Sequence, residues 1–319
     1  MLLGLAGGAC GASTPEVAVP ETPLLGPLST LAPPEARMVI LSRPAELFRR
    51  PSTRRILHAL WPEAALDGFA ARTGVDLRRL DELVVVDHPD GWVALARGGD
   101  LDAAFAVREA GERMAPLESS RDAPWPRRVG FLGERRVDLG ALSPEVIAWV
   151  SGPPSLAAEV YGRAERPAPA RDHALGEPEP TSLWRAHGDA PFLLIAPHPL
   201  GLPRDSGVGV LLARQEALAL SARLAPGPDG GEGDEIALTL DLRGRFPSTA
   251  TANFLALARS LAATPEGAAV GARDVLDTLA LEVGDRRVLL EGRVRTAVLA
   301  AGLRVLFVAE IDELLRSGG

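Results

Sequence analysis

Residues 83–95 read Leu-Val-Val-Val-Asp-His-Pro-Asp-Gly-Trp-Val-Ala-Leu and predict a β-hairpin. Two apolar runs, Leu83–Val86 and Trp92–Leu95, flank the segment Asp87–Gly91, and Pro-Asp-Gly is a strong turn sequence. Short apolar runs bounded by turn residues are typical of strands with little exposure to water. The hairpin therefore indicates antiparallel β structure in the first part of the chain.

A second strand-forming stretch lies in the other half. Ile236, Leu238, Leu240 and Leu242 alternate with polar or small neighbours, and this period of two predicts a half-buried antiparallel strand. Further predicted strands cover 37–42, 128–132, 136–139, 146–150, 191–196, 209–213, 216–224, 278–283 and 287–293. Predicted helices begin at Pro51 and cover 64–72, 102–113, 155–163, 254–261 and 296–316.

Two similar segments begin hairpins in the two halves. Leu80-Asp81-Glu82-Leu83 precedes the hairpin at 83–95, and Leu276-Asp277-Thr278-Leu279 precedes the predicted strands 278–283 and 287–293. Each follows a predicted helix. The order predicts an α+β fold of two related halves, each an antiparallel sheet with helices packed on one face.

A Pro-rich, aperiodic segment at 165–181 separates these halves. Such composition is typical of a linker or a long surface loop, and a chain of 319 residues is long enough for two domains. We therefore expect a first α+β domain at 37–164, a linker at 165–181 and a second α+β domain at 182–319.

Composition excludes some functions. The chain is 46% hydrophobic and 24% charged, as is usual for a globular protein. Its formal charge of −8 argues against a nucleic-acid partner, because such binding depends on basic patches that neutralise phosphates. All 34 basic residues are arginine. We interpret this as a coding bias, so arginine pairs carry little functional information.

The single cysteine, Cys10, follows a run of apolar and small residues, Met1–Ala9. This arrangement resembles the end of a bacterial lipoprotein signal, and it implies lipid attachment at Cys10 and a membrane partner through an acyl anchor. No Arg or Lys precedes Cys10, and Gly7 stands where the pattern prefers Leu. We expect residues 1–10 to be a truncated signal. Two alternatives remain: a secretory signal cut near Ala12 or Ser13, and a cytoplasmic chain with a disordered N-terminus.

The residues after Cys10 predict a flexible tether. Segment 11–36 is rich in Pro, Ala, Thr, Ser and Leu and has neither a helical nor a strand period. Gly11 is compatible with the outer membrane, because Asp at this place tends to retain lipoproteins in the inner membrane. The expected location is the periplasmic side of the cell envelope. No apolar run is long enough to predict a transmembrane helix.

No residue pattern predicts catalysis, a metal or a cofactor. The five histidines show no ligand spacing; we expect the His58 ring to be partly buried and hydrogen-bonded, and His88 to be exposed in the turn. The chain has no Gly-x-Ser-x-Gly motif. His198 and the loop Asp205–Gly207 form only a weak fragment of a triad.

The layout resembles uncharacterised bacterial envelope lipoproteins built from tandem α+β repeats, on the strength of the tether after Cys10 and the two Leu-Asp-x-Leu segments. That resemblance carries no known activity. It implies a non-enzymatic, lipid-anchored protein that binds an envelope protein or has a structural role in the envelope. One alternative is a carrier of an apolar ligand such as a lipid. Another is a hydrolase, which would reveal itself as a cleft where a His meets Asp and Ser.

Overall fold

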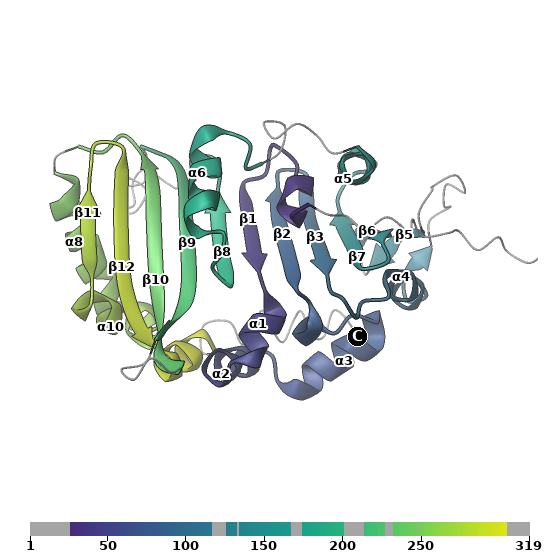
Figure 1. Ribbon diagram of the computed structural model, residues 1–319, viewed down its shortest axis with the longest axis horizontal. Coiled ribbons are helices and arrows are strands. Elements are labelled where there is room, and N and C mark those ends of the chain that lie inside the picture. The colour runs from purple at the N-terminus through teal and green to yellow at the C-terminus, as the bar shows by residue number, and fades with distance from the viewer. Residues whose placement is uncertain are drawn as a thin grey trace, which may run out of the picture.

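The computed structural model describes residues 26–116, 126–132, 134–166, 174–200, 214–226, 232–247 and 249–304. They form one antiparallel sheet in the order β11-β12-β10-β9-β8-β1-β2-β3-β7-β6-β5-β4 (Figure 1). The strands are β1 (Met38–Ser42), β2 (Glu82–His88), β3 (Gly91–Arg97), β4 (Ala115–Pro116), β5 (Arg127–Leu132), β6 (Arg135–Ser143), β7 (Val146–Ser151), β8 (Phe192–Ala196), β9 (Gln215–Pro226), β10 (Glu232–Gly244), β11 (Ala280–Val283) and β12 (Arg287–Arg295).

Helices surround this sheet. They are η1 (Leu28–Leu31), α1 (Pro44–Arg49), α2 (Pro51–Leu60), α3 (Glu63–Thr73), η2 (Leu77–Arg79), α4 (Ala103–Gly111), α5 (Pro154–Glu165), α6 (Pro178–His187), α8 (Ala250–Ala263), α9 (Pro265–Ala269) and α10 (Ala272–Asp277). Residues 296–304 are also helical, as expected for the start of the predicted helix 296–316. The predicted strand 209–213 lies outside the described residues.

Strand β1 joins the two halves of the chain. Its residue Ile40 lies opposite Val85 of β2 on one side and opposite Leu194 of β8 on the other. The apolar run Met38–Leu41 suits a strand inside a sheet, because both of its faces can be buried. The predicted α+β class is confirmed, but one sheet replaces the two that we expected. The division into units 37–164 and 182–319 stays a prediction, and the predicted linker 165–181 overlaps the start of α6.

Alternation along the strands gives the sheet two covered faces. On β6, Val137 and Leu139 belong to the core cluster that α4 covers. Gly140 faces the opposite side, where the Tyr161 ring of α5 fills the place of a β-carbon. In the other half, α6 covers one face and α8 the other. Helices therefore pack on both faces of the sheet, whereas the sequence predicted one, because these strands are apolar on both sides.

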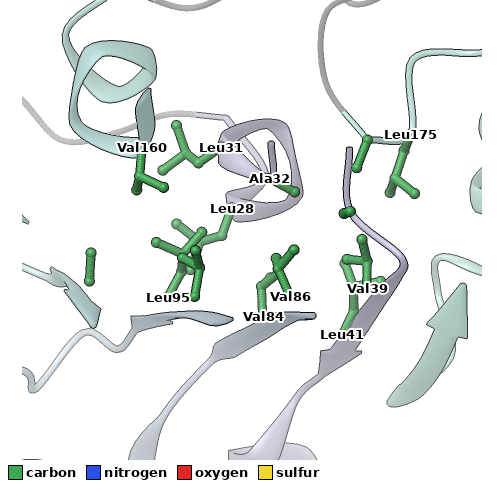
Figure 2. Packing of buried hydrophobic residues seen from close by; sticks show 14 of the residues in the cluster. Leu28, Leu31, Ala32, Val39, Leu41, Val84, Val86, Leu95, Val160 and Leu175 are labelled. Carbon is green, nitrogen blue, oxygen red and sulfur yellow. The ribbon is translucent and has the colours of Figure 1, made fainter. Parts of the chain in front are cut away.

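The last part of the predicted tether belongs to the core. Leu28, Leu31, Ala32 and Ala36 are at most 5% exposed and pack over the centre of the sheet. Figure 2 shows η1 lying above Val84, Val86 and Leu95, with Val160 of α5 on one side and Leu175 on the other. The flexible tether predicted at 11–36 is thus wrong for residues 26–36. The apolar residues hidden among the prolines bury their side chains there.

Two charged residues hold the same segment from below. The backbone N–H of Leu28 donates to Oε1 of Glu82 at 3.0 Å, and Arg97 donates to the carbonyl of Gly26 at 2.7 Å. Arg97 also pairs with Glu82 at 3.2 Å. Burial raises the pKa of Glu82, although the charge of Arg97 opposes this. We call Glu82 and Arg97 the N-terminal clasp, since they bind Gly26 and Leu28, at the start of the described residues.

Candidate functional site

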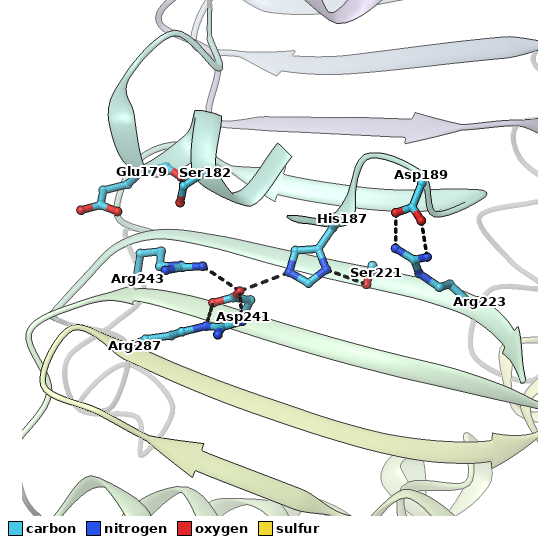
Figure 3. Close-up of polar contacts among 9 residues, drawn as sticks. All are labelled: Glu179, Ser182, His187, Asp189, Ser221, Arg223, Asp241, Arg243 and Arg287. Carbon is cyan, nitrogen blue, oxygen red and sulfur yellow. Dashed lines mark hydrogen bonds and ion pairs between the residues drawn. The ribbon is translucent and has the colours of Figure 1, made fainter. Parts of the chain in front are cut away.

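A serine, a histidine and an aspartate lie in a row beneath α6. His187, the last residue of α6, has its Nε2 atom 3.2 Å from Oδ2 of Asp241 on β10. Its Nδ1 atom is 3.4 Å from Oγ of Ser221 on β9 (Figure 3). These contacts join residues that are 34 and 54 positions apart in the chain. The side chains have the order of a Ser-His-Asp triad.

Two arginines neutralise Asp241. Arg287 of β12 donates to both of its carboxylate oxygens, at 3.1 and 2.8 Å, and Arg243 donates to Oδ2 at 3.0 Å (Figure 3). Burial alone would raise the pKa of Asp241. The hydrogen bonds from His187 and Arg287 and the charge of Arg243 outweigh burial, and the pKa is about 2 instead of 3.8. The carboxylate therefore stays ionised throughout the physiological range.

The strand pattern explains how these residues meet. Ile236 and Leu242 are buried in the clusters on one face of β10, so Asp241 and Arg243 point to the other. Asp241 lies opposite Leu289 of β12, which places Arg287 two residues away on the same face as the aspartate. The apolar residues on one face of β10 thus direct the charged residues Asp241 and Arg243 to the opposite face.

Burial decides what this arrangement can do. Asp241 is 0%, Ser221 1% and His187 8% exposed. A nucleophilic serine needs room for a substrate carbonyl and an oxyanion beside it, but the described residues close over Ser221. Two arginines also hold Asp241, and the contacts of His187 connect the end of α6 to β9 and β10.

A second buried aspartate repeats the chemistry in the other half. Asp138 of β6 is 0% exposed and accepts hydrogen bonds from Arg127 of β5 and from the hydroxyl of Tyr161 on α5, the latter at 3.1 Å. Arg136 completes the set with an ion pair at 3.4 Å. Burial and the charge of Asp138 raise the pKa of Tyr161 well above its usual range, so the phenol stays a neutral donor. We call Asp138 and Asp241 the buried aspartates.

The two buried aspartates occupy equivalent places in the sheet. Asp241 lies on the third strand from one edge and Asp138 on the third strand from the other. Each is bound by an arginine of the next outer strand, β12 or β5, and by a ring from a covering helix, α6 or α5. Between them lies the central core with η1. The pair therefore fixes the two helices that flank the N-terminal segment.

The residues that the sequence singled out are spread over the molecule. Cys10, His173 and the loop Asp205–Gly207 lie outside the described residues. The ring of His198 has its Nε2 atom 3.3 Å from the backbone carbonyl of Pro34. His88 was expected in solvent, but it is 5% exposed and its Nδ1 accepts the backbone N–H of Asp90 at 3.1 Å.

The hairpin turn explains the error at His88. The turn contains only two residues, Pro89 and Asp90, and His88 is still paired with Gly91. Since β2 buries every second residue, His88 shares the covered face of Val84 and Val86. The same period of two that predicted the strand also places His88 on its buried face.

Within the described ranges, no group of three or more His, Cys, Asp or Glu side chains could hold a metal ion. The same ranges contain no helix with the length and apolarity to cross a membrane. The same ranges contain two arginine–aspartate groups, around Asp138 and Asp241, which no sequence motif predicted.

Comparisons with known proteins give one structural likeness. No family model and no curated protein sequence matches this chain. The fold is similar to the crystal structure of TP0453 from Treponema pallidum, with a TM-score of 0.48 and 14% sequence identity. The likeness covers 88% of this chain and 97% of that protein. This similarity concerns the α+β fold alone.

Proposed function

We propose that this chain is a lipid-anchored, extracytoplasmic protein that binds a partner in the cell envelope and is not an enzyme. The main support is the N-terminal segment 26–36, which is built into the centre of the core. A protein that hangs from an acylated Cys10 must transmit force through this segment. The N-terminal clasp and the burial of Leu28 can resist this force, because they connect the segment to the central strands β2 and β3.

Metabolic labelling tests the anchor. Cells that carry the full-length gene receive a fatty-acid analogue, and the parent protein is expected to become labelled. Cys10→Ser is expected to lose nearly all of the label and to leave the membrane fraction, because two or three acyl chains anchor a protein firmly. Ser13→Ala is the matched control and should behave like the parent. Equal labelling of the Cys10→Ser protein would contradict the proposal.

The buried Ser-His-Asp array provides the test of the non-enzymatic role. Because Ser221 is closed off and Asp241 is held by arginines, a fluorophosphonate probe is expected to leave the purified protein unlabelled. Ser221→Ala serves as the control for background labelling. Labelling of the parent that disappears in Ser221→Ala would identify a reactive serine and overturn this part of the proposal.

The alternative of an apolar-ligand carrier finds less support in the described residues. A hollow of about 480 Å³ is lined by Arg49, Arg54, His58, Glu63 and Arg78 and by only two apolar residues, Ala45 and Phe48. Ligand pockets for apolar molecules are mostly lined by apolar side chains. Native mass spectrometry of the purified protein that shows a co-purifying lipid inside the fold would favour the carrier instead.

A further inference from the structure

The hollow beneath the sheet gathers basic side chains from separate helices. Ala45 and Arg49 lie four residues apart on α1, and Arg54 and His58 lie four residues apart on α2. Residues at this spacing share a helix face, so α1 and α2 turn these faces to one space. Glu63 of α3 and Arg78 of η2 close its other side. Figure 1 shows these helices grouped at one end of the sheet.

Three arginines line the hollow, and two of them have no carboxylate partner among the described residues. Arg78 is occupied, because it pairs with Asp67 and Asp76, each at 2.8 Å. The side chains of Arg49 and Arg54, in contrast, have neither an ion pair nor a hydrogen bond among the residues that the structure describes. Both residues line the same hollow, and a guanidinium group can donate to an anion in a forked geometry.

His58 also lines the hollow. Its Nδ1 atom is buried and has no hydrogen-bond partner in the described part of the chain. The ring is held edge-on against Phe48, with centroids 5.9 Å apart. The sequence predicted a satisfied ring, so this is a correction. Because this nitrogen is closed to solvent, the ring lines the hollow without offering Nδ1 to a ligand there.

We propose that this pocket binds the phosphate group of a phosphate ester. Arg49 and Arg54 supply two guanidinium groups, and their two positive charges match a phosphate dianion better than a singly charged carboxylate. The hollow of about 480 Å³ is much larger than a bare phosphate. It therefore has room for the organic group that carries the phosphate.

Glu63 opposes this ligand and modulates its affinity. The carboxylate lines the hollow and lies 3.9 Å from Arg78, with its side chain 73% exposed. Its charge repels an incoming phosphate, although solvent and Arg78 screen it. Removing the charge with Glu63→Gln is accordingly expected to strengthen phosphate binding, which is a direction that a general loss of structure cannot produce.

The phosphate can come from a soluble ester or from a lipid headgroup, and the experiment separates them. Isothermal titration of the purified full chain with glycerol 3-phosphate measures the soluble source. Flotation with vesicles of phosphatidylcholine, with and without phosphatidic acid, measures the headgroup. Saturable binding in either arm that depends on the pocket supports the proposal. Binding in neither arm overturns it.

The chain offers matched controls on the same helices. Arg49→Ala and Arg54→Ala are each expected to weaken binding about tenfold, as for the loss of one charge-assisted hydrogen bond. Arg50→Ala and Arg55→Ala remove equally exposed arginines that do not line the hollow and should bind like the parent. Equal affinities in all four variants would refute the site. Loss of acylation at Cys10 would leave this result unchanged, so the two proposals fail separately.

Discussion

Replacing Asp241 with alanine is expected to lower the free energy of unfolding by about 3 kcal/mol, because the change removes a fully buried carboxylate from two partly exposed arginines. Arg243 and Arg287 lose their shared carboxylate, and His187 loses its partner at the end of α6. Chemical denaturation of the purified protein measures this loss. The effect should be among the largest of any single polar substitution in the described part of the chain.

The control for Asp241 is an exposed ion pair of the same type. Asp189 pairs with Arg223, but the Asp189 side chain is 72% exposed. Asp189→Ala should therefore cost about 0–1 kcal/mol. Similar costs for Asp241→Ala and Asp189→Ala would show that burial does not strengthen the arginine–aspartate group beneath α6.

The pKa of Asp241 adds a dependence on pH to the same prediction. Its value of about 2 in the folded chain lies below 3.8, so the folded state favours the ionised form. The resulting stabilisation, about 2 kcal/mol, is complete above about pH 5 and is lost as the pH falls through about 2. Asp241→Asn should lack this dependence. The stability gap between parent and Asp241→Asn is therefore expected to shrink in acid, and a constant gap would contradict the account.

Leu28→Ala is expected to destabilise the fold by about 2–5 kcal/mol, the usual cost of a cavity at a fully buried leucine. Leu28 is 1% exposed and lies in the central core between α5 and the strands. The matched control, Leu261→Ala on α8, changes a leucine that is 46% exposed and should cost about 0.5 kcal/mol. Denaturant unfolding of both variants measures the two losses of stability. Equal losses would mean that segment 26–36 does not contribute to the core.

Local patterns were enough to predict most strands but could not predict their neighbours. The alternation at Ile236–Leu242 predicted β10, and the turn at Pro89 and Asp90 predicted the β2–β3 hairpin. The pairing of β1 with β8, in contrast, joins residues about 150 positions apart, and nothing in either strand specifies that partner. For this reason, the sequence alone did not predict that the strands form one continuous sheet.

The buried aspartates were missed for a related reason. Asp241 stands on the polar side of an alternating strand, where an exposed carboxylate is the usual expectation. It is buried only because α6, which is distant in the chain, covers it. For Leu28 and Leu31, a weak signal did exist, since they are three residues apart, but the surrounding prolines concealed it.

The position of the N-terminal clasp has a consequence for orientation. Glu82 begins β2, and Leu80 just before it accepts the backbone N–H of Ala45, so the clasp and α1 share one end of the sheet. The fifteen residues between Cys10 and Gly26 span at most about 50 Å when fully extended. Under the anchor that we propose, the tether from Cys10 would therefore lead to Gly26 at the rim of the sheet that also carries the arginine-lined hollow.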